Sequence, residues 1–374
     1  MEGTKPRTAS SLGMFDLLKG VGMLLIVFAH TSELYPVGDI STITPVTFFL
    51  FAYRESLMAA FYIASGYGFR KRSIGKCISQ QFKTLFKPYA YTGLATTIAH
   101  FVIHYKTFGN WNNAVYETYK ALGGFVLGLP HTATYFGQEF FSCGPMWYLL
   151  ALMIGWILLD IILNIFPESY IKWAVLGTML LGWGISLVWE APFCIAQGMV
   201  TVPYLYIGFL AKKKRLFEKK FRPLAILGLL AAALGVALGV LLTGKTDCVS
   251  LGEWTMGPVS ILLDGIVGLG FIVLFMKVQR LLDNPVTHLI EAVGRRSLYI
   301  FCIHTVELTA VPWYLMVQKY AAAPTKGLWL QYAVSLGSIF LLCELLLRRR
   351  DVMLKFFPAR RRHFAEHKRY VAKH

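Results

Sequence analysis

The stretch FDLLKGVGMLLIVFAH, residues 15–30, decides how the rest of the chain is interpreted. It forms the centre of an apolar run long enough to cross a membrane as a helix, yet it contains Asp16, Lys19 and His30. At about 100° per residue, these side chains lie at roughly 0°, 300° and 320° around the helix axis and share one face. A charge in a bilayer costs about 3 kcal/mol on insertion scales. Titratable groups aligned on one face of a membrane helix therefore predict a functional site.

A simpler explanation covers part of this face. Asp16 and Lys19 could extend from the helix end to the inner membrane surface. His30 lies about 16 Å further along the helix than Lys19, so this explanation does not extend to it. A buried structural histidine remains the alternative to a catalytic role for His30.

Composition places the chain in the membrane class. Of its 374 residues, 56% are hydrophobic and only 15% are charged, against about 25% charged in soluble domains. The apolar runs are too long for barrel strands. We therefore expect an all-α, polytopic membrane protein with about ten transmembrane helices. The predicted spans are 14–34, 46–69, 84–104, 145–165, 171–189, 197–211, 223–242, 257–279, 297–316 and 327–347.

The net charge of +17 is unevenly distributed along the chain. With the N-terminus in the cytoplasm, most Lys and Arg residues fall in the inner segments, and this is the positive-inside pattern. Both termini are therefore predicted to be cytoplasmic, and the basic tail at 348–374 is expected to anchor on an anionic leaflet of the lipid bilayer rather than to bind nucleic acid. The inner segments are 1–13, 70–83, 166–170, 212–222, 280–296 and 348–374, and the outer lysines are Lys106, Lys120, Lys245, Lys319 and Lys326.

The whole chain, 1–374, is expected to form one transmembrane domain in a cell membrane, with the bacterial cytoplasmic membrane as the expected location. The first apolar run is expected to stay uncleaved, because it carries charges and no small-residue cleavage site follows it. The longest outer stretch, 105–144, includes residues 113–130, which are predicted to form an interfacial or re-entrant helix. An eleventh span there is the alternative, but it would destroy the charge agreement.

Six cysteines are scattered singly, and none has the spacing of a metal site. No metal is expected. A disulfide between Cys143 and Cys248 is left open.

Several polar residues fall at membrane depth. Arg54 and Glu55 are adjacent on the second span, so they do not face each other, and Glu33 is a candidate partner for Arg54. On the ninth span, His304 and Glu307 are three residues apart and can touch, whereas Tyr299 lines a different face. Two further polar residues lie within spans: Ser65, which with Gly66 permits close helix approach, and Asp264, which lies near mid-depth. Other polar residues lie on the outer side, and the histidines among them are expected to be solvent-exposed loop residues. These outer residues are Glu139, His100, His104 and His131.

Four segments, taken together and in order, resemble the acyltransferase-3 family of integral-membrane acyltransferases, and within it the fucose 4-O-acetylase type. Lysine at position 19 stands where arginine is more usual, and the family's arginine-pair motif is not cleanly present. The matching segments are Asp16, Lys19 and His30 in the first span, FYIASGYGF (61–69) leading to Lys83, Lys87, Pro88 and Tyr89, PMWYLLALM (145–153), and RRSLYIFCIH (295–304).

The resemblance implies transfer of an acyl group, usually acetyl, from cytoplasmic acetyl-CoA to a hydroxyl of an extracytoplasmic or lipid-linked carbohydrate. Acetyl-CoA would be a co-substrate, and no metal is implied. Arg70, Arg72, Lys83 and Lys87 are candidates for binding the phosphates of the donor. The same basic residues are also explained by topology alone.

His30 is the candidate general base, taking a proton from the acceptor hydroxyl, or alternatively the nucleophile. Asp16 and Lys19 complete the predicted catalytic face, and Arg54 could stabilise the developing oxyanion. The carboxylate that orients His30 is left open between Asp264, Glu55 and Glu307. The predicted substrate-binding residues are Glu55, Ser65, Asp264, Tyr299, His304, Glu139 and Trp147.

Two other functions remain open on the sequence. A transporter or flippase for a polar or anionic solute would use His30, Arg54 and Asp264 as a permeation path. A non-catalytic membrane scaffold would tolerate substitution of His30. The oligomeric state is not fixed by the sequence.

Overall fold

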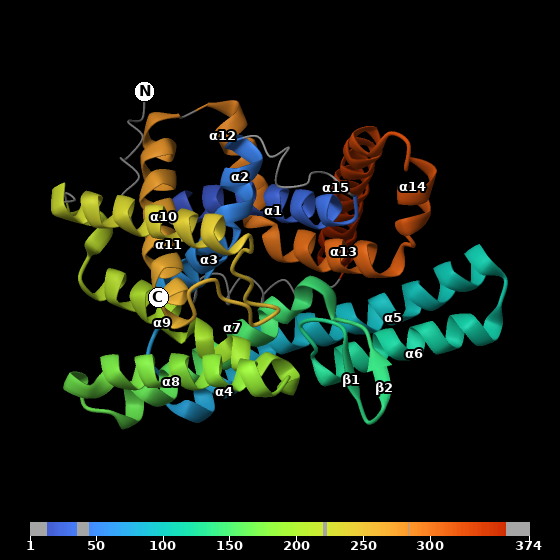
Figure 1. Cartoon of the computed structure of the whole chain (residues 1–374). Helices are drawn as coiled ribbons and strands as arrows, with labels where there is room; N and C mark the ends of the chain where they lie inside the picture. Colours follow the sequence, from blue (N-terminus) through green and yellow to red (C-terminus); the bar gives the residue numbers. More distant parts are fainter. Residues whose placement is uncertain (1–12, 36–44, 220–222, 283, 357–374) are drawn as a thin grey trace.

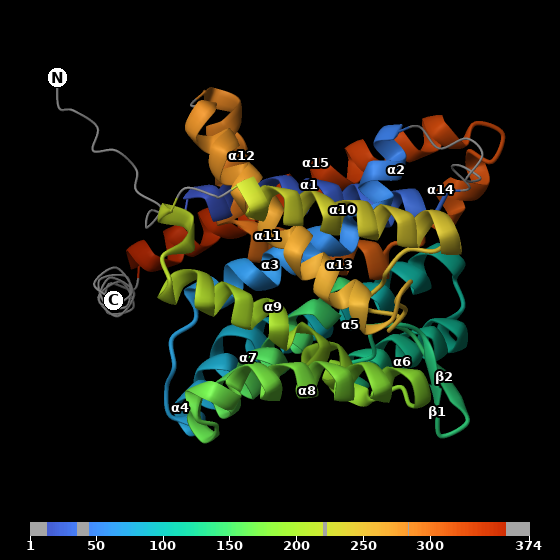
Figure 2. The ribbon, with the colours of Figure 1, turned by 60° about the vertical axis from the view of Figure 1, so that its left-hand side comes forward.

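The computed structural model describes residues 13–35, 45–219, 223–282 and 284–356. This part of the chain is almost wholly helical (Figure 1). Figure 2 shows most of the long helices running roughly side by side, with the start of α1 and the end of α15 at the same end of the molecule. The predicted all-α, polytopic fold is confirmed. Residues 1–12 and the basic segment 357–374 lie outside the described residues.

The long helices form the body of the molecule, and short helices and one hairpin connect them. The long helices are α1 (Gly13–Glu33), α5 (Lys87–Phe108), α6 (Trp111–Leu127), α7 (Trp147–Ile165), α8 (Glu168–Val188), α9 (Ile195–Lys213), α10 (Pro223–Thr243), α11 (Pro258–Leu281) and α15 (Pro324–Phe356). The shorter ones are α2 (Pro45–Ala52), α3 (Arg54–Gly68), α4 (Ile74–Gln81), α12 (Pro285–Arg295), α13 (Ser297–Ala310) and α14 (Tyr314–Lys319).

Within the described residues, seven helical segments are long and apolar enough to cross a membrane, and they coincide with seven of the ten predicted spans. The predicted span 46–69 is broken at Tyr53 into α2 and α3, and 84–104 falls on α5, which does not qualify as a span. The span 297–316 is also interrupted, because α13 ends where Val311 precedes Pro312 and takes an extended conformation. The seven segments are Phe15–Glu33, Gly144–Ile165, Glu168–Val188, Pro192–Lys213, Pro223–Thr243, Pro258–Leu281 and Pro324–Arg349.

One helical run, α4 to α5, continues through a π-helical turn at Phe82–Phe86 (η3). Pro88, in the first turn of α5, has no N–H to donate to the preceding turn. The π turn lies directly before this proline, as a single-turn insertion inside an otherwise α-helical run. The run therefore extends from residue 74 to 108, about 50 Å, and links the two ends of the molecule.

The centre of the bundle is packed closely around α3, α7, α9 and α11. At the crossing of α3 and α9, a Cβ added to Gly66 would lie 2.1 Å from the Leu205 carbonyl oxygen, and one added to Gly208 would lie 2.0 Å from that of Ile63. Only glycine permits this approach of two backbones. The neighbouring core includes the fully buried Tyr62 and Tyr204.

The predicted helix at 113–130 exists as α6, which returns beside α5. His100 of α5 lies 2.9 Å from Thr118 of α6, and Tyr89 donates a hydrogen bond to the Phe125 carbonyl. His100 is therefore buried between two helices, and the prediction that it is a solvent-exposed loop residue was wrong. α6 is followed by an antiparallel hairpin, β1 (Ala133–Tyr135) with β2 (Gln138–Phe140).

Candidate active site

Two imidazole rings face each other between α1 and α13. The ring of His30 lies 5.6 Å from that of His304, centroid to centroid, with a tilt of 35°. His304 is almost fully buried, whereas the His30 side chain keeps 30% of its exposure. The fold thus brings a buried and an accessible histidine together from opposite ends of the chain.

His304 is held in one orientation by a carboxylate. Its Nδ1 lies 3.1 Å from Glu307 Oε2, and Glu307 Oε1 accepts a hydrogen bond of 2.8 Å from Ser335 Oγ of α15. Because a carboxylate only accepts, Nδ1 carries the proton and Nε2 keeps its lone pair. Nε2 is buried and has no hydrogen-bond partner among the described residues. This arrangement leaves Nε2 of His304 buried without a partner, in a ring that lies next to the ring of His30.

His30 belongs to a second polar chain. Its Nδ1 lies 3.5 Å from Glu33 Oε2, and Glu33 Oε1 accepts a hydrogen bond of 3.3 Å from Arg54 Nη1. The pairing of Arg54 with Glu33 proposed from the sequence is confirmed. Glu33 contacts both His30 and Arg54. Its contact with His30 was not predicted from the sequence. The spacing of three residues between His30 and Glu33 would have indicated it, because such residues lie on the same face of a helix.

The three carboxylates considered as orienting groups for His30 have other partners. Glu55 lies 3.9 Å from Arg54 Nε, Asp264 accepts a hydrogen bond of 2.5 Å from Ser56, and Glu307 orients His304. The choice among them was therefore wrong, because Glu33 is the carboxylate beside His30.

An outer loop completes the surroundings of Asp264. Asp247, in the segment between α10 and α11, is 3% exposed and lies within hydrogen-bonding reach of Asp264. Its Oδ1 also accepts a bond of 2.5 Å from the backbone N–H of Thr255. The sequence did not indicate that this loop folds back into the bundle.

The remaining predicted substrate residues are dispersed. Trp147 is buried at the start of α7, and Ser65 lies on α3 within reach of Tyr148. Tyr299 is largely exposed on α13, and Glu139 lies on the exposed hairpin, 3.8 Å from Lys120. The structure does not bring these four residues to the imidazole pair.

Asp16 and Lys19 lie at the other end of α1 from His30. Asp16 is 4.0 Å from Arg295 Nη1, and Lys19 is close enough to Asp16 for electrostatic attraction. A Cβ on Gly294 of α12 would lie 1.8 Å from the Asp16 carbonyl, so α12 packs directly on this part of α1. These residues are therefore part of the inner end of the bundle.

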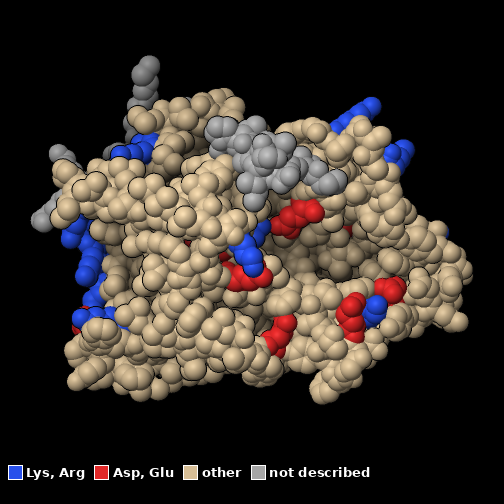
Figure 3. All heavy atoms as spheres, viewed as in Figure 1, with Lys and Arg blue, Asp and Glu red and all other residues tan. Residues whose placement is uncertain are grey.

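The predicted donor-binding residues form two groups. Arg70 and Arg72 precede α4, where the Arg72 backbone N–H donates to Asp160 Oδ1 at 3.0 Å and Arg70 lies near Lys212. Figure 3 shows Lys and Arg side chains gathered at this end of the molecule.

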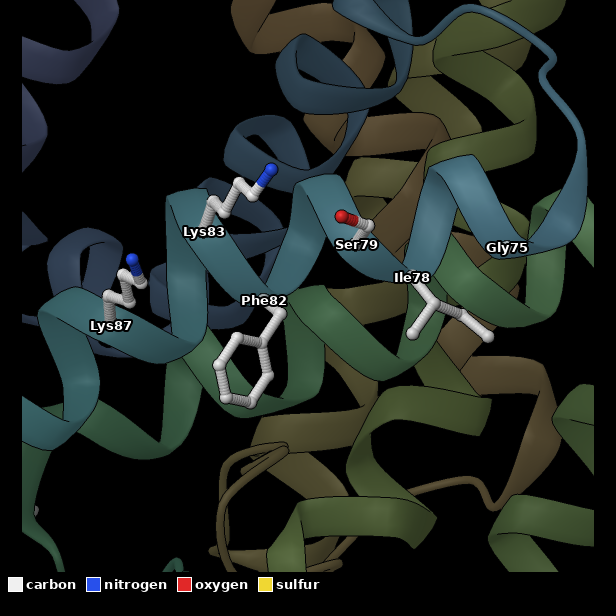
Figure 4. A pocket seen from close by; sticks show the side chains of 6 residues that line it. All are labelled: Gly75, Ile78, Ser79, Phe82, Lys83 and Lys87. Atoms are coloured by element: carbon white, nitrogen blue, oxygen red, sulfur yellow. The ribbon is translucent and has the colours of Figure 1, made fainter.

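Lys83 and Lys87 line a groove of about 460 Å³ further along the same helical run. Figure 4 shows both lysines projecting on one side of the helix and the apolar side chains of Ile78 and Phe82 on the other. Among the described residues, neither lysine has an ion-pair partner. The groove therefore offers a cationic edge and an apolar edge.

α5 connects this groove with the imidazole pair. Thr92, about 7 Å beyond Lys87 along the helix, lies within hydrogen-bonding reach of Cys302 of α13. His304 follows Cys302 by two residues on that helix. α5, which begins at Lys87, therefore packs on the helix that carries His304.

The opposite end of the molecule carries a hollow between α13 and the α5–α6 hairpin, and acidic side chains around it lie next to Lys and Arg side chains (Figure 3). Nearby outer loops are joined by His131, whose Nε2 lies 2.7 Å from Glu190 Oε2 and whose Nδ1 lies 3.1 Å from the Ser250 carbonyl. The hydrogen bond to Glu190 raises the pKa of His131 above its usual value, against the opposing effect of burial.

Comparison with known proteins identifies the family of the chain. A family model described as an acyltransferase domain matches residues 13–348, nearly the whole chain. Neither a curated protein nor a solved structure matches the chain. On the strength of the family match, this membrane protein belongs to the acyltransferase-3 family.

Proposed function

We propose that the protein transfers an acyl group, with acetyl as the expected one, from acyl-CoA on the inner side to a hydroxyl of a carbohydrate on the outer side. The observation that carries this proposal is the imidazole of His304, which lies 5.6 Å from that of His30, with Nδ1 held by Glu307 and Nε2 without a hydrogen-bond partner among the described residues. Positioned bases of this kind contribute about 10²- to 10⁴-fold to the rates of such reactions.

The chemistry needs a proton acceptor, a stabilised oxyanion and a leaving thiol. The acceptor hydroxyl gives its proton to an imidazole as its oxygen bonds to the thioester carbonyl carbon. The carbon–sulfur bond then breaks, and the thiolate of coenzyme A takes up the proton. Arg54 lies 3.3 Å from Glu33, which also contacts His30, so Arg54 is the candidate for stabilising the oxyanion.

The two histidines divide this work. His304 is buried and oriented, so it is the candidate base. His30 is partly exposed and next to Glu33, so it is placed to contact the acceptor and to share the proton with His304. Loss of either ring should therefore stop transfer.

The surroundings support the choice of substrates. Coenzyme A carries several phosphate charges, which the unpaired Lys83 and Lys87 can neutralise, while its pantetheine arm suits the apolar edge of the groove. Around the outer hollow, acidic side chains that accept hydrogen bonds lie next to Lys and Arg side chains that donate them, and this mixture suits a polyhydroxylated acceptor such as a sugar.

The test is release of free coenzyme A and transfer of labelled acetyl to surface glycans by membranes that contain the full chain. His30→Gln and His304→Gln should each lower both signals by about 100-fold or more. The matched control is His288→Gln, since His288 also has a glutamate three residues later, at 3.7 Å, but lies on α12 and is half exposed. A transporter would move an intact solute and leave the thioester uncleaved, and that result would reject the proposal.

A further inference from the structure

Two cysteines from distant parts of the chain meet beside the end of α6. Cys143 directly precedes the short helix η4 (Gly144–Met146), and Cys194 ends η5 (Pro192–Cys194), just before α9. Both residues are fully buried. They are fixed to consecutive carbonyls, because the Cys143 N–H donates to Leu129 at 2.9 Å and the Cys194 thiol donates to Gly128 at 3.1 Å.

Their side chains are also in reach of each other. The Cys194 thiol lies within hydrogen-bonding reach of the Cys143 thiol. Cys248, which the sequence left open as a partner for Cys143, instead has its sulfur 3.2 Å from Ser250 Oγ. In the structure the thiols are free, and Cys194 is the cysteine whose thiol lies beside that of Cys143.

The backbone at Cys194 supports a special arrangement. Phe193 and Cys194 have φ values of +58° and +54°, a left-handed conformation that costs energy for residues other than glycine. Such conformations persist only where the surroundings determine them strongly. Here they turn the Cys194 side chain from the start of α9 towards α6 and Cys143.

We propose that Cys143 and Cys194 form a disulfide bond on the extracytoplasmic side of the membrane. Both residues lie at the end of the bundle that the positive-inside pattern assigns to the outer, oxidising side. In the reaction each thiol loses its proton, one sulfur–sulfur bond forms, and two electrons pass to an exchanging disulfide of a thiol oxidase, which becomes a dithiol. The exchange takes place before the ends of α6, α7 and α9 close over the two sulfurs.

The bond acts on the wall of the candidate active site. A Cβ added to Gly144 would lie 3.1 Å from Thr309 Oγ1 and 3.6 Å from Thr305 Cγ2, so the residue after Cys143 packs against α13. α13 carries His304. A covalent link at Cys143 thus holds η4 against the helix that positions this histidine.

The test counts free thiols in the full-length protein in its native membrane. Cells are quenched in acid, the unfolded protein is alkylated with and without prior reduction, and the peptides are identified by mass spectrometry. Without reduction, Cys143 and Cys194 should be unmodified and joined in one cross-linked peptide pair, while Cys77, Cys248, Cys302 and Cys343 are alkylated. Alkylation of Cys143 and Cys194 in most molecules without reduction would overturn the proposal.

Two variants make the assignment independent of folding yield. Cys143→Ser should free the thiol of Cys194 in the fraction that folds, whereas Cys343→Ser should leave the cross-link intact. A reductant should lower the thermal unfolding temperature of the wild type by about 5 °C and leave that of Cys143→Ser unchanged. An equal effect of reductant on both proteins would contradict the bond.

Discussion

The ring of His304 lies 5.6 Å from the ring of His30, and Glu307 Oε2 lies 3.1 Å from Nδ1 of His304. The carboxylate therefore holds the proton on the side of His304 that faces away from its unoccupied nitrogen. This contact fixes the tautomer and the orientation of the ring before any substrate binds.

Glu307→Gln should lower kcat by about 10- to 100-fold while changing KM for acyl-CoA little, because the amide keeps the shape but not the charge that fixes the tautomer. Ser335→Ala, which removes one hydrogen bond to Glu307, should have a smaller effect in the same direction. The measurement is steady-state acyl transfer by membranes with matched amounts of folded protein. Ser338→Ala is the control, since Ser338 bonds only the Ser335 carbonyl among described residues. Equal losses in the Ser335 and Ser338 variants would contradict the positioning role.

The groove lysines should act on the donor. Lys83→Ala and Lys87→Ala should each raise KM for acyl-CoA by about 5- to 10-fold, the loss of one charge-assisted contact with phosphate, and leave kcat within about twofold. The effect should shrink at high salt, because partly exposed charges are screened. Lys172→Ala, an exposed lysine on α8, should change neither constant. If the lysine variants match Lys172→Ala, the groove does not bind the donor.

The crossing of α3 and α9 should be intolerant of a methyl group. Gly66→Ala forces a contact of 2.1 Å with the Leu205 carbonyl, and such overpacking costs about 1–3 kcal/mol or more. We expect a lower unfolding temperature and a lower folded yield. Gly68→Ala is the matched control, because the same helix leaves open space there. Similar unfolding temperatures for the two variants would show that the backbones are not this close.

The outer-loop contact of His131 should depend on pH. The pKa of His131 is raised in the folded protein above its usual value, so its stabilising effect is complete below about pH 6.5 and is lost as the pH rises through the raised pKa. The unfolding temperature of the wild type should therefore exceed that of His131→Gln more at pH 6 than at pH 9. A difference independent of pH would mean that the charged pair with Glu190 does not form.

Contacts between residues that are close together in the sequence could be predicted. The apolar run around His30 predicted α1, and the spacing of His304 and Glu307 predicted their contact, because residues three apart meet on any helix. A buried arginine needs a carboxylate partner from another helix, and Glu33 at the outer end of the first span was therefore predicted as the partner of Arg54.

Contacts between segments that are far apart in the sequence could not be predicted in this way. The facing of His30 and His304 depends on how α1 and α13 pack, which no helical period encodes. The return of Asp247 into the bundle also depends on a loop without periodicity. The predicted spans failed where the helix is interrupted, at Tyr53 and before Pro312.

The central claim is that the two facing imidazoles carry out acyl transfer. The most direct measurement is the initial rate of labelled acetyl transfer from acetyl-CoA to surface glycans in membranes with equal amounts of folded wild type, His30→Gln, His304→Gln and His288→Gln. We predict that the first two variants lose about 100-fold or more of the rate and that the third stays within about twofold of the wild type. Wild-type rates from either His30→Gln or His304→Gln would contradict the account.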